Sequence, residues 1–143
     1  MTRDTVLKEI LDGAGVRIIC SYIDDVYRVR DMFLGQDDVV LIQEKNYIQT
    51  PKENGYRSLH LIVQIPVFLS NMKKNISVEV QIRTAAMDFW ANLEHELKYK
   101  NEYKDMTLIK ELKQCSDKAY LLDQEMLLLR DRITLFNHSS LSG

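Results

Sequence analysis

The most regular hydrophobic pattern of the chain lies near its C-terminal end. Apolar residues recur there at alternating steps of four and three, at Leu108, Leu112, Cys115, Ala119, Leu122, Met126, Leu129, Ile133 and Phe136. This spacing predicts one long helix with a coiled-coil-like seam. Four further apolar side chains widen its apolar surface: Tyr120, Leu121, Leu127 and Leu128. Because a single domain covers only one face of a helix, we expect the other face to pack against a second subunit.

Strict alternation of apolar and polar residues predicts two strands in the middle of the chain. The first strand begins at Ser58 and continues to Phe68. One of its faces carries Leu59, Leu61 and Val63, and the other carries Ser58, His60 and Ile62. The second strand covers residues 77–84, and one of its faces carries Val78, Val80 and Ile82. Glu79, Gln81 and Arg83 then form a row on the opposite side, about 7 Å apart at successive positions.

The remaining patterns complete an α+β fold. They predict helices at 2–11, 24–34 and 85–100, a buried strand at 16–20 and a further strand at 39–48. The 24–34 helix is expected to point Val26, Val29, Met32 and Phe33 inward, with Asp24 and Asp25 at its positive N-terminal end. Three consecutive strands between 39 and 83 favour antiparallel pairing, joined by the 16–20 strand through a helical crossover. The expected architecture is a mixed, largely antiparallel sheet flanked by helices.

Composition narrows the class of protein. A chain of 143 residues with 45% hydrophobic content suits one domain with its own core. The net charge of −2 argues against a general polyanion binder, so a basic site must be local. Cys20 and Cys115 have no paired spacing, which is typical of reduced thiols in the cytoplasm. No apolar run approaches membrane-spanning length, and we therefore expect a cytoplasmic protein.

Candidate chemistry gathers where a turn enters the strand at 58–68. Pro51 and the pair Asn54-Gly55 predict the turn, and Tyr56, Arg57, Ser58 and His60 follow it. An aromatic ring beside a cation is typical of a nucleotide pocket. The row of Glu79, Gln81 and Arg83 could hold a metal and a phosphate chain. An ordinary surface hairpin and a solvated strand face are the alternatives for these two stretches.

The sequence excludes two other motifs, one for zinc and one for nucleotide phosphates. His95-Glu96 resembles the start of the zinc motif His-Glu-x-x-His, but Tyr99 stands where the second histidine belongs. The chain also has no Gly-rich Walker loop. Phosphate must therefore be held by side chains.

Three motifs in this order carry a family resemblance. The stretches 12–17 (Asp-Gly-Ala-Gly-Val-Arg), 54–60 (Asn-Gly-Tyr-Arg-Ser-Leu-His) and 79–84 (Glu-Val-Gln-Ile-Arg-Thr) resemble the synthetase domain of RelA/SpoT-type proteins. The short length and the helical tail look like the small alarmone synthetases. That family makes (p)ppGpp by moving the β,γ-pyrophosphate of ATP to the 3′-hydroxyl of GDP or GTP. The resemblance covers about residues 12–100 and implies a nucleotidyltransferase-like fold.

The resemblance also implies roles for individual residues. Asp12 and Glu79 would hold Mg²⁺, a hard cation that prefers carboxylate oxygen, and Glu79 could instead take the proton of the 3′-hydroxyl. Tyr56 would stack on guanine with Asn54 nearby. The acceptor phosphates and the floor of the site would be lined by Lys45, Arg57, His60, Gln81 and Arg83. Small alarmone synthetases are typically tetramers, so we expect a synthetase domain at 1–105, an oligomerisation helix at 106–137 and a disordered tail at 138–143.

One feature of the family is not matched. Its ATP side is built mostly upstream of the Asp12 motif, from an Arg-x-Lys element, and here only eleven residues precede Asp12. Two hypotheses stay open: a (p)ppGpp synthetase, or a guanine-nucleotide-binding oligomeric module without useful catalysis. Affinity for ATP discriminates between them. A third hypothesis, single-stranded RNA binding, is opposed by the negative charge and by the single stacking aromatic in the motif.

Overall fold

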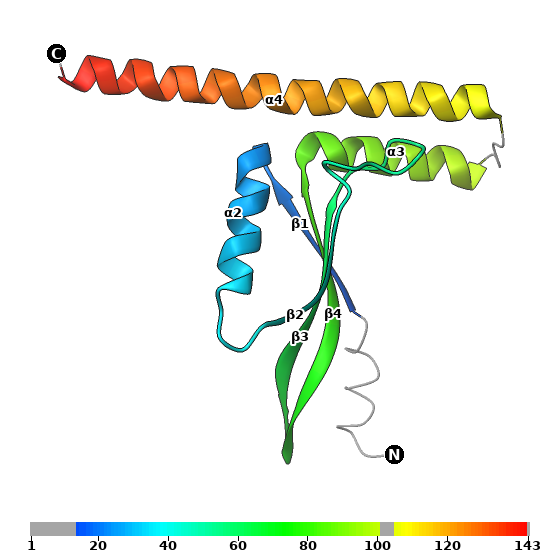
Figure 1. Ribbon diagram of the computed structural model, residues 1–143, viewed down its shortest axis with the longest axis vertical. Coiled ribbons are helices and arrows are strands. Elements are labelled where there is room, and N and C mark those ends of the chain that lie inside the picture. The colour runs from blue at the N-terminus through cyan, green and yellow to red at the C-terminus, as the bar shows by residue number, and fades with distance from the viewer. Residues whose placement is uncertain (1–13, 101–104, 143) are drawn as a thin grey trace.

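The computed structural model describes residues 14–100 and 105–142 of the chain (Figure 1). In chain order its elements are β1 (Ala14–Cys20), α2 (Ile23–Leu34), β2 (Val40–Asn46), β3 (Leu59–Leu69), β4 (Met72–Thr84), α3 (Ala85–Lys100) and α4 (Met106–Ser142). The helix expected at 2–11 and the candidate ligand Asp12 lie outside the described residues. None of the helices in the described ranges is long and apolar enough to cross a membrane.

The sheet has the mixed topology that the sequence predicts. Its strand order is β1-β4-β3-β2. The β2–β3 and β3–β4 pairs are antiparallel, whereas β1 runs parallel to β4, so the chain crosses over through α2 between β1 and the antiparallel strands. The α+β fold, with a largely antiparallel sheet and a long C-terminal helix, is confirmed.

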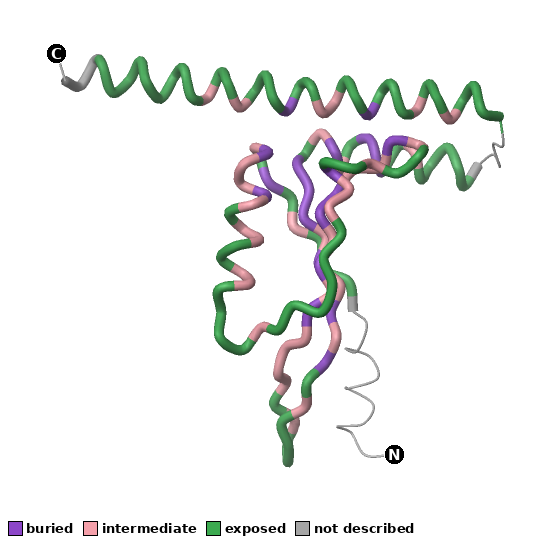
Figure 2. The backbone as a smooth tube through the Cα atoms, in the orientation of Figure 1, coloured by how far each residue is buried: buried purple, intermediate pink, exposed green. Residues whose placement is uncertain are grey.

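The core lies on one face of this sheet. Leu59, Leu61 and Val63 of β3 are fully buried, and Val80 and Ile82 of β4 lie beside them, as the alternation predicts (Figure 2). The helix α2 covers this face, with Val26 fully buried. Each such side chain contributes about 1.5–3 kcal/mol by leaving water. The opposite face of β3 and β4 is therefore left for the polar row.

Two predictions about burial are wrong. The 16–20 stretch is a strand but not a buried one: β1 is an edge strand, and Val16 and Ile19 are 46% and 45% exposed. Met32 is 74% exposed instead of facing inward. At 3.6 residues per turn Met32 lies about 120° around the helix from Val26, so it falls off the stripe that meets the sheet.

The acidic start of α2 has a different role from simple capping. Asp24 and Asp25 do lie in its first turn, but Tyr22 is the N-cap residue and no side chain caps the helix. Asp24 accepts two hydrogen bonds from Arg130 of α4, at 2.7 and 3.0 Å. Hydrogen bonding from Arg130 is the main reason why the pKa of Asp24 lies below its usual value. Asp24 thus ties α2 to the C-terminal helix.

The C-terminal helix begins at Met106 and runs across one end of the sheet (Figure 1). It continues through Ser142, so residues 138–142 are helical and not a disordered tail as predicted. Its buried or half-buried side chains include Leu112, Ser116, Ala119, Tyr120, Asp123 and Leu127. Most of the heptad seam lies elsewhere on the helix and is exposed, including Leu122, Met126, Leu129, Ile133 and Phe136. The face that meets the domain is therefore more polar than the seam.

Candidate functional site

The turn that enters β3 is closed by its own backbone. The amide of Gly55 donates to the carbonyl of Lys52 at 2.8 Å, and the amide of Lys52 donates to the carbonyl of Tyr56 at 3.1 Å. The Asn54 side chain accepts a hydrogen bond from the Tyr56 amide at 3.1 Å. Gly55 has a φ of 100°, a conformation that favours glycine. The pair Asn54-Gly55 thus forms the turn that the sequence predicts, here called the 52–56 turn.

Three rings meet beside this turn. Tyr47, Tyr56 and His60, here called the ring cluster, contact one another edge to face, with centroids 5.1–6.2 Å apart. The Lys52 ammonium lies 5.0 Å from the Tyr47 ring and 5.1 Å from the Tyr56 ring. Trp90 of α3 lies behind Tyr56, at 6.5 Å. The site therefore combines aromatic surface with a cation, the combination that a nucleotide requires.

The polar row on β4 is present and hydrogen bonded along its length. Arg83 donates to the Gln81 side chain at 2.7 Å, and Gln81 donates to Glu79 at 3.1 Å. Arg83 is 4% exposed and also donates to Asp88 of α3 at 3.1 Å and to the Tyr56 hydroxyl at 2.6 Å. The row thus joins the ring cluster through a buried guanidinium.

Strand register brings the other candidates to the same face. Lys45 of β2 is opposite His60, His60 is opposite Gln81, and Gln81 is opposite Arg17 of β1. Lys45 is exposed, so its ammonium is available to a ligand on this face. Arg17 lies 3.6 Å from Asp88, which already binds Arg83. Cationic side chains of β1, β2 and β4 therefore lie on the sheet face that carries the ring cluster.

His60 is held as a neutral imidazole. Burial lowers the pKa of His60 below its usual value; the Glu79 carboxylate opposes this shift, and Lys52, Arg83 and Lys45 add to it. Because Arg83 donates to the Tyr56 hydroxyl, that hydroxyl is free to donate to Nε2 of His60, 3.0 Å away. This network assigns the ring proton to Nδ1, which faces Glu79 at 3.4 Å. A hydrogen-bonded chain therefore runs from Arg83 through Tyr56 and His60 toward Glu79.

Arg57 does not join this group. Its guanidinium donates to the Ile48 carbonyl and, at 3.1 Å, to Asp117 of α4, and it lies 4.1 Å from the centroid of the Tyr120 ring. Its side chain is only 10% exposed. The expectation that Arg57 lies along acceptor phosphates has no support in these contacts, which are made with the C-terminal helix and with the backbone of the preceding loop.

Two residues of the site were missed by sequence reasoning. Tyr47 supplies one of the three rings, and Lys52 supplies the cation above two of them. Tyr47 follows Lys45 by two positions, and Lys52 opens the turn, so both lie close to candidate site residues in the sequence. The stretch 45–48 (Lys-Asn-Tyr-Ile) also resembles an element of the family and is the signal that could have found Tyr47. A lysine in a turn carries no signal of its own, and only the tertiary structure brings it to the rings.

Of the two candidate metal ligands, Glu79 lies within the described residues and Asp12 lies outside them. Glu79 offers an oxygen ligand of the kind that Mg²⁺ prefers, and its side chain is 45% exposed. Within residues 14–100 and 105–142 no group of three or more His, Cys, Asp and Glu side chains is arranged to hold a metal ion. Asp12 precedes Gly15 by three residues in sequence, and Gly15 is the register partner of Glu79. The carboxylate of Glu79 fits a metal that takes its remaining ligands from elsewhere, including substrate phosphates.

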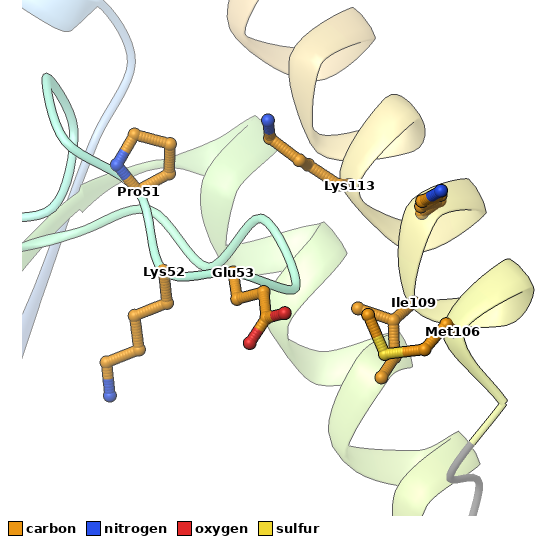
Figure 3. Close-up of a pocket in the computed structure, with 7 residues that line it drawn as sticks. Pro51, Lys52, Glu53, Met106, Ile109 and Lys113 are labelled. Atoms are coloured by element: carbon orange, nitrogen blue, oxygen red, sulfur yellow. The ribbon is translucent and has the colours of Figure 1, made fainter.

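A hollow of about 370 Å³ lies between the 52–56 turn and the start of α4. It is lined by Pro51, Lys52, Glu53, Met106, Ile109, Lys110 and Lys113 (Figure 3). Lys113 extends toward Pro51, whereas Lys52 extends away from α4 (Figure 3). Since Lys52 also lies above the rings of Tyr47 and Tyr56, this lysine-rich hollow adjoins the ring cluster.

Comparison with known sequences points to one family. Residues 1–104 match the family described as "Region found in RelA / SpoT proteins". The GTP pyrophosphokinase YwaC of Bacillus subtilis (strain 168) is 46% identical over 134 residues, which cover 93% of this chain and 64% of that protein. GTP pyrophosphokinase YjbM of the same organism is 38% identical over 128 residues, 89% of this chain and 61% of that protein. The chain therefore spans less than two thirds of the length of these relatives.

Comparison with solved structures agrees. Small alarmone synthetase 2 from Bacillus subtilis matches with a TM-score of 0.80 and 43% identity, covering 92% of this chain and 77% of that one. Small alarmone synthetase 1 from the same organism, bound to its product pppGpp, matches with a TM-score of 0.78 and 37% identity, covering 89% and 66%. Because the family match covers more than half of its residues, the chain belongs to the RelA/SpoT family.

Proposed function

We propose that this chain carries the guanine-nucleotide side of a (p)ppGpp synthetase, which transfers pyrophosphate from ATP to the 3′-hydroxyl of GDP or GTP. The observation that carries the proposal is the ring cluster with Lys52 above it and Glu79 at the end of the same hydrogen-bonded network. The names of its relatives, both GTP pyrophosphokinases, support this reading. So does the likeness to a synthetase structure that holds pppGpp.

The acceptor nucleotide would be bound by the turn and the rings. Tyr56 stacks on the guanine, and Asn54 fixes the backbone of the turn that presents Tyr56. Lys45 and Lys52 supply positive charge for the acceptor phosphates. His60 is neutral and holds its ring proton on Nδ1, so it orients the Glu79 carboxylate without adding a charge of its own.

Glu79 would act on the acceptor hydroxyl. As an exposed carboxylate on the sheet face it can accept the proton of the 3′-hydroxyl, and Gln81 holds one of its oxygens in place. Mg²⁺, held by Glu79 and by Asp12, would neutralise charge on the transferred phosphates. Gln81 and Arg83 act by position: they fix Glu79 and the Tyr56 hydroxyl relative to each other.

The donor nucleotide, ATP, is the second substrate of the proposed reaction. One related structure, small alarmone synthetase 1 bound to AMPCPP, matches this fold with a TM-score of 0.68 and 34% identity. Among the described residues Arg17 lies on the same face as the row and reaches Asp88, and its exposed side chain is a further cation for phosphate. The assay below decides whether the chain uses ATP or only binds the acceptor.

We further propose that α4 mediates homo-oligomerisation, with a tetramer as the state that the family resemblance implies. The seam residues Leu129, Ile133 and Phe136 are 45–72% exposed and line an open hollow of about 500 Å³. The double variant Leu129→Glu/Ile133→Glu should dissociate the assembly in light scattering, whereas Phe68→Glu, at an exposed apolar side chain of β3, should not. A monomeric unaltered chain at micromolar concentration would contradict the proposal.

The test of the proposed reaction is product formation. Anion-exchange chromatography of ATP with GDP or GTP and Mg²⁺ should show a new guanosine tetra- or pentaphosphate. The product should disappear with Glu79→Gln and persist with Glu125→Gln, which changes an exposed carboxylate of α4 in the same way. Guanine-nucleotide binding without product would favour a non-catalytic binding module. No binding of guanine nucleotides would refute both.

A further inference from the structure

The 52–56 turn rests directly on the C-terminal helix. The Ser116 hydroxyl donates to the carbonyl of Gly55, and Ser116 is 3% exposed. A Cβ at Gly55 would lie 2.7 Å from the Cβ of Ser116 and 2.9 Å from the Cα of Lys113, closer than real Cβ contacts. Gly55 is therefore required here for two reasons: its positive φ, and the approach of the turn backbone to the helix.

Arg57 adds a second attachment immediately after the turn. Its guanidinium bonds to the Ile48 carbonyl before the turn and to Asp117 of α4, and it stacks over Tyr120. The chain segments that enter and leave the turn are thereby joined to the same stretch of helix. Removal of Asp117 or of the Tyr120 ring would leave a largely buried guanidinium with fewer partners.

The helix α4 also bonds to two residues next to the site, Trp90 and Thr84. Trp90, which lies behind Tyr56, donates to the Leu112 carbonyl at 2.9 Å. The carboxylate of Asp123 accepts a 2.6 Å hydrogen bond from Thr84, the residue that follows Arg83 on β4. The α4 residues at 112, 116, 117, 120 and 123 thus form one continuous face against the site. The exposed seam residues such as Leu122 and Met126 lie outside this face.

We infer that Ser116, Asp117 and Tyr120 are positioning residues for the guanine nucleotide: they hold the 52–56 turn so that Tyr56 faces the base. The inference rests on the proposed function and names the part of the chain that sets the affinity for the acceptor. The Tyr56 side chain is also held by Arg83 and His60, but the backbone of the turn is closed by short-range bonds, and α4 and Arg57 are what fix that backbone from outside. A shift of about 1 Å at such a positioning element can cost about a hundredfold in rate.

The three positioning residues Ser116, Asp117 and Tyr120 are here called the clamp. The experiment uses the whole chain with two variants of this clamp. Asp117→Asn/Tyr120→Leu removes the charge and the ring that hold Arg57, whereas Tyr120→Phe keeps the ring. Glu125→Gln is the matched control on an exposed position of the same helix. Calorimetry with GDP and with a non-hydrolysable ATP analogue measures the two affinities separately. Fluorescence of Trp90, the only tryptophan of the chain, reports whether α4 stays against α3.

The double variant should bind GDP at least about tenfold more weakly, the effect of losing one charge-assisted hydrogen bond, with ATP-analogue affinity within about twofold of the unaltered chain. Tyr120→Phe and Glu125→Gln should bind GDP normally. Unchanged GDP affinity in the double variant would overturn the inference. Equal loss of both affinities together with altered Trp90 fluorescence would also overturn it, because that pattern is general unfolding.

Hydrogen exchange separates this inference from the proposed function. In the nucleotide-free chain, the amides of Gly55 and Tyr56 should exchange faster in the double variant, whereas amides of β3 and β4 should keep their protection. If the unaltered chain bound no guanine nucleotide, the proposed function and the nucleotide role of the clamp would both fail. Unchanged exchange in the turn would overturn the claim that α4 holds it, whatever the affinity for GDP.

Discussion

Arg83 and Arg17 bind the same carboxylate, that of Asp88. Comparing them therefore measures how much the buried guanidinium contributes to the free energy of unfolding. Arg83 lies 3.1 Å from Asp88 with its side chain 5% exposed, whereas Arg17 lies 3.6 Å away and is 52% exposed. Arg83 also holds the Tyr56 hydroxyl and the Gln81 amide. We therefore compare Arg83→Met with Arg17→Met, which removes the same chemical group from the same partner.

The expected magnitudes differ severalfold. Removing one partner of a buried ion pair costs about 3–5 kcal/mol, and since Asp88 keeps Arg17 we expect about 3 kcal/mol for Arg83→Met. An exposed pair is worth about 0–1 kcal/mol, which is the expectation for Arg17→Met. For a chain of this size about 3 kcal/mol corresponds to a fall of about 10 °C in melting temperature.

The assay is urea unfolding followed by the fluorescence of Trp90, at one fixed protein concentration because oligomerisation would add to stability. Arg83→Met should move the midpoint far below that of Arg17→Met, with similar slopes. Equal midpoints for the two variants would refute the reasoning, since they would show that burial and the bonds to Tyr56 and Gln81 add nothing. A larger loss for Arg17→Met would refute it as well.

Three further predictions concern charge. Burial raises the pKa of Asp123, so the native state keeps a proton that the unfolded chain has lost. The free energy of unfolding therefore falls as pH rises from about 4. Over that range Asp123→Asn should be more stable than the unaltered chain, as measured by urea midpoints. Burial lowers the pKa of His60, so stability should fall as pH drops below about 6.5, and His60→Gln should remove this component; an unchanged pH profile would contradict the assignment. Arg130→Gln should lower the urea midpoint by releasing Asp24, and the difference should shrink in high salt; a salt-independent difference would show that the pair acts through packing.

The sequence predicted the strands of the site well because, in a strand, the alternating pattern decides which face each side chain lies on. With Val78, Val80 and Ile82 committed to the core, Glu79, Gln81 and Arg83 had to share the opposite face, and the hydrogen bonds along that row confirm it. The turn at Asn54-Gly55 was predicted for an equally local reason, because this pair tolerates a positive φ. Local patterns thus recovered the fold class and the main row of the candidate site.

What the sequence did not reveal depends on contacts between distant residues. Arg57 looked like a phosphate ligand from its neighbours, but Asp117, sixty positions away, binds it. The sequence predicted a helix with two apolar faces and did not show which of them would meet the domain. Ser116 and Asp123 make the buried contacts, because they meet a turn and a strand end rather than another helix. Spacing along one element does not report the polarity of the surface that it meets.

The central claim is that the ring cluster binds a guanine nucleotide. The measurement that tests it most directly is calorimetric titration of GDP into the unaltered chain, into Tyr56→Ala and into Tyr99→Ala, a tyrosine of α3 that is 87% exposed. Stacking on an aromatic ring is worth about 1–3 kcal/mol, so Tyr56→Ala should weaken GDP binding about five- to 150-fold while Tyr99→Ala binds normally. Equal affinities for all three chains, or no binding by the unaltered chain, would contradict the account.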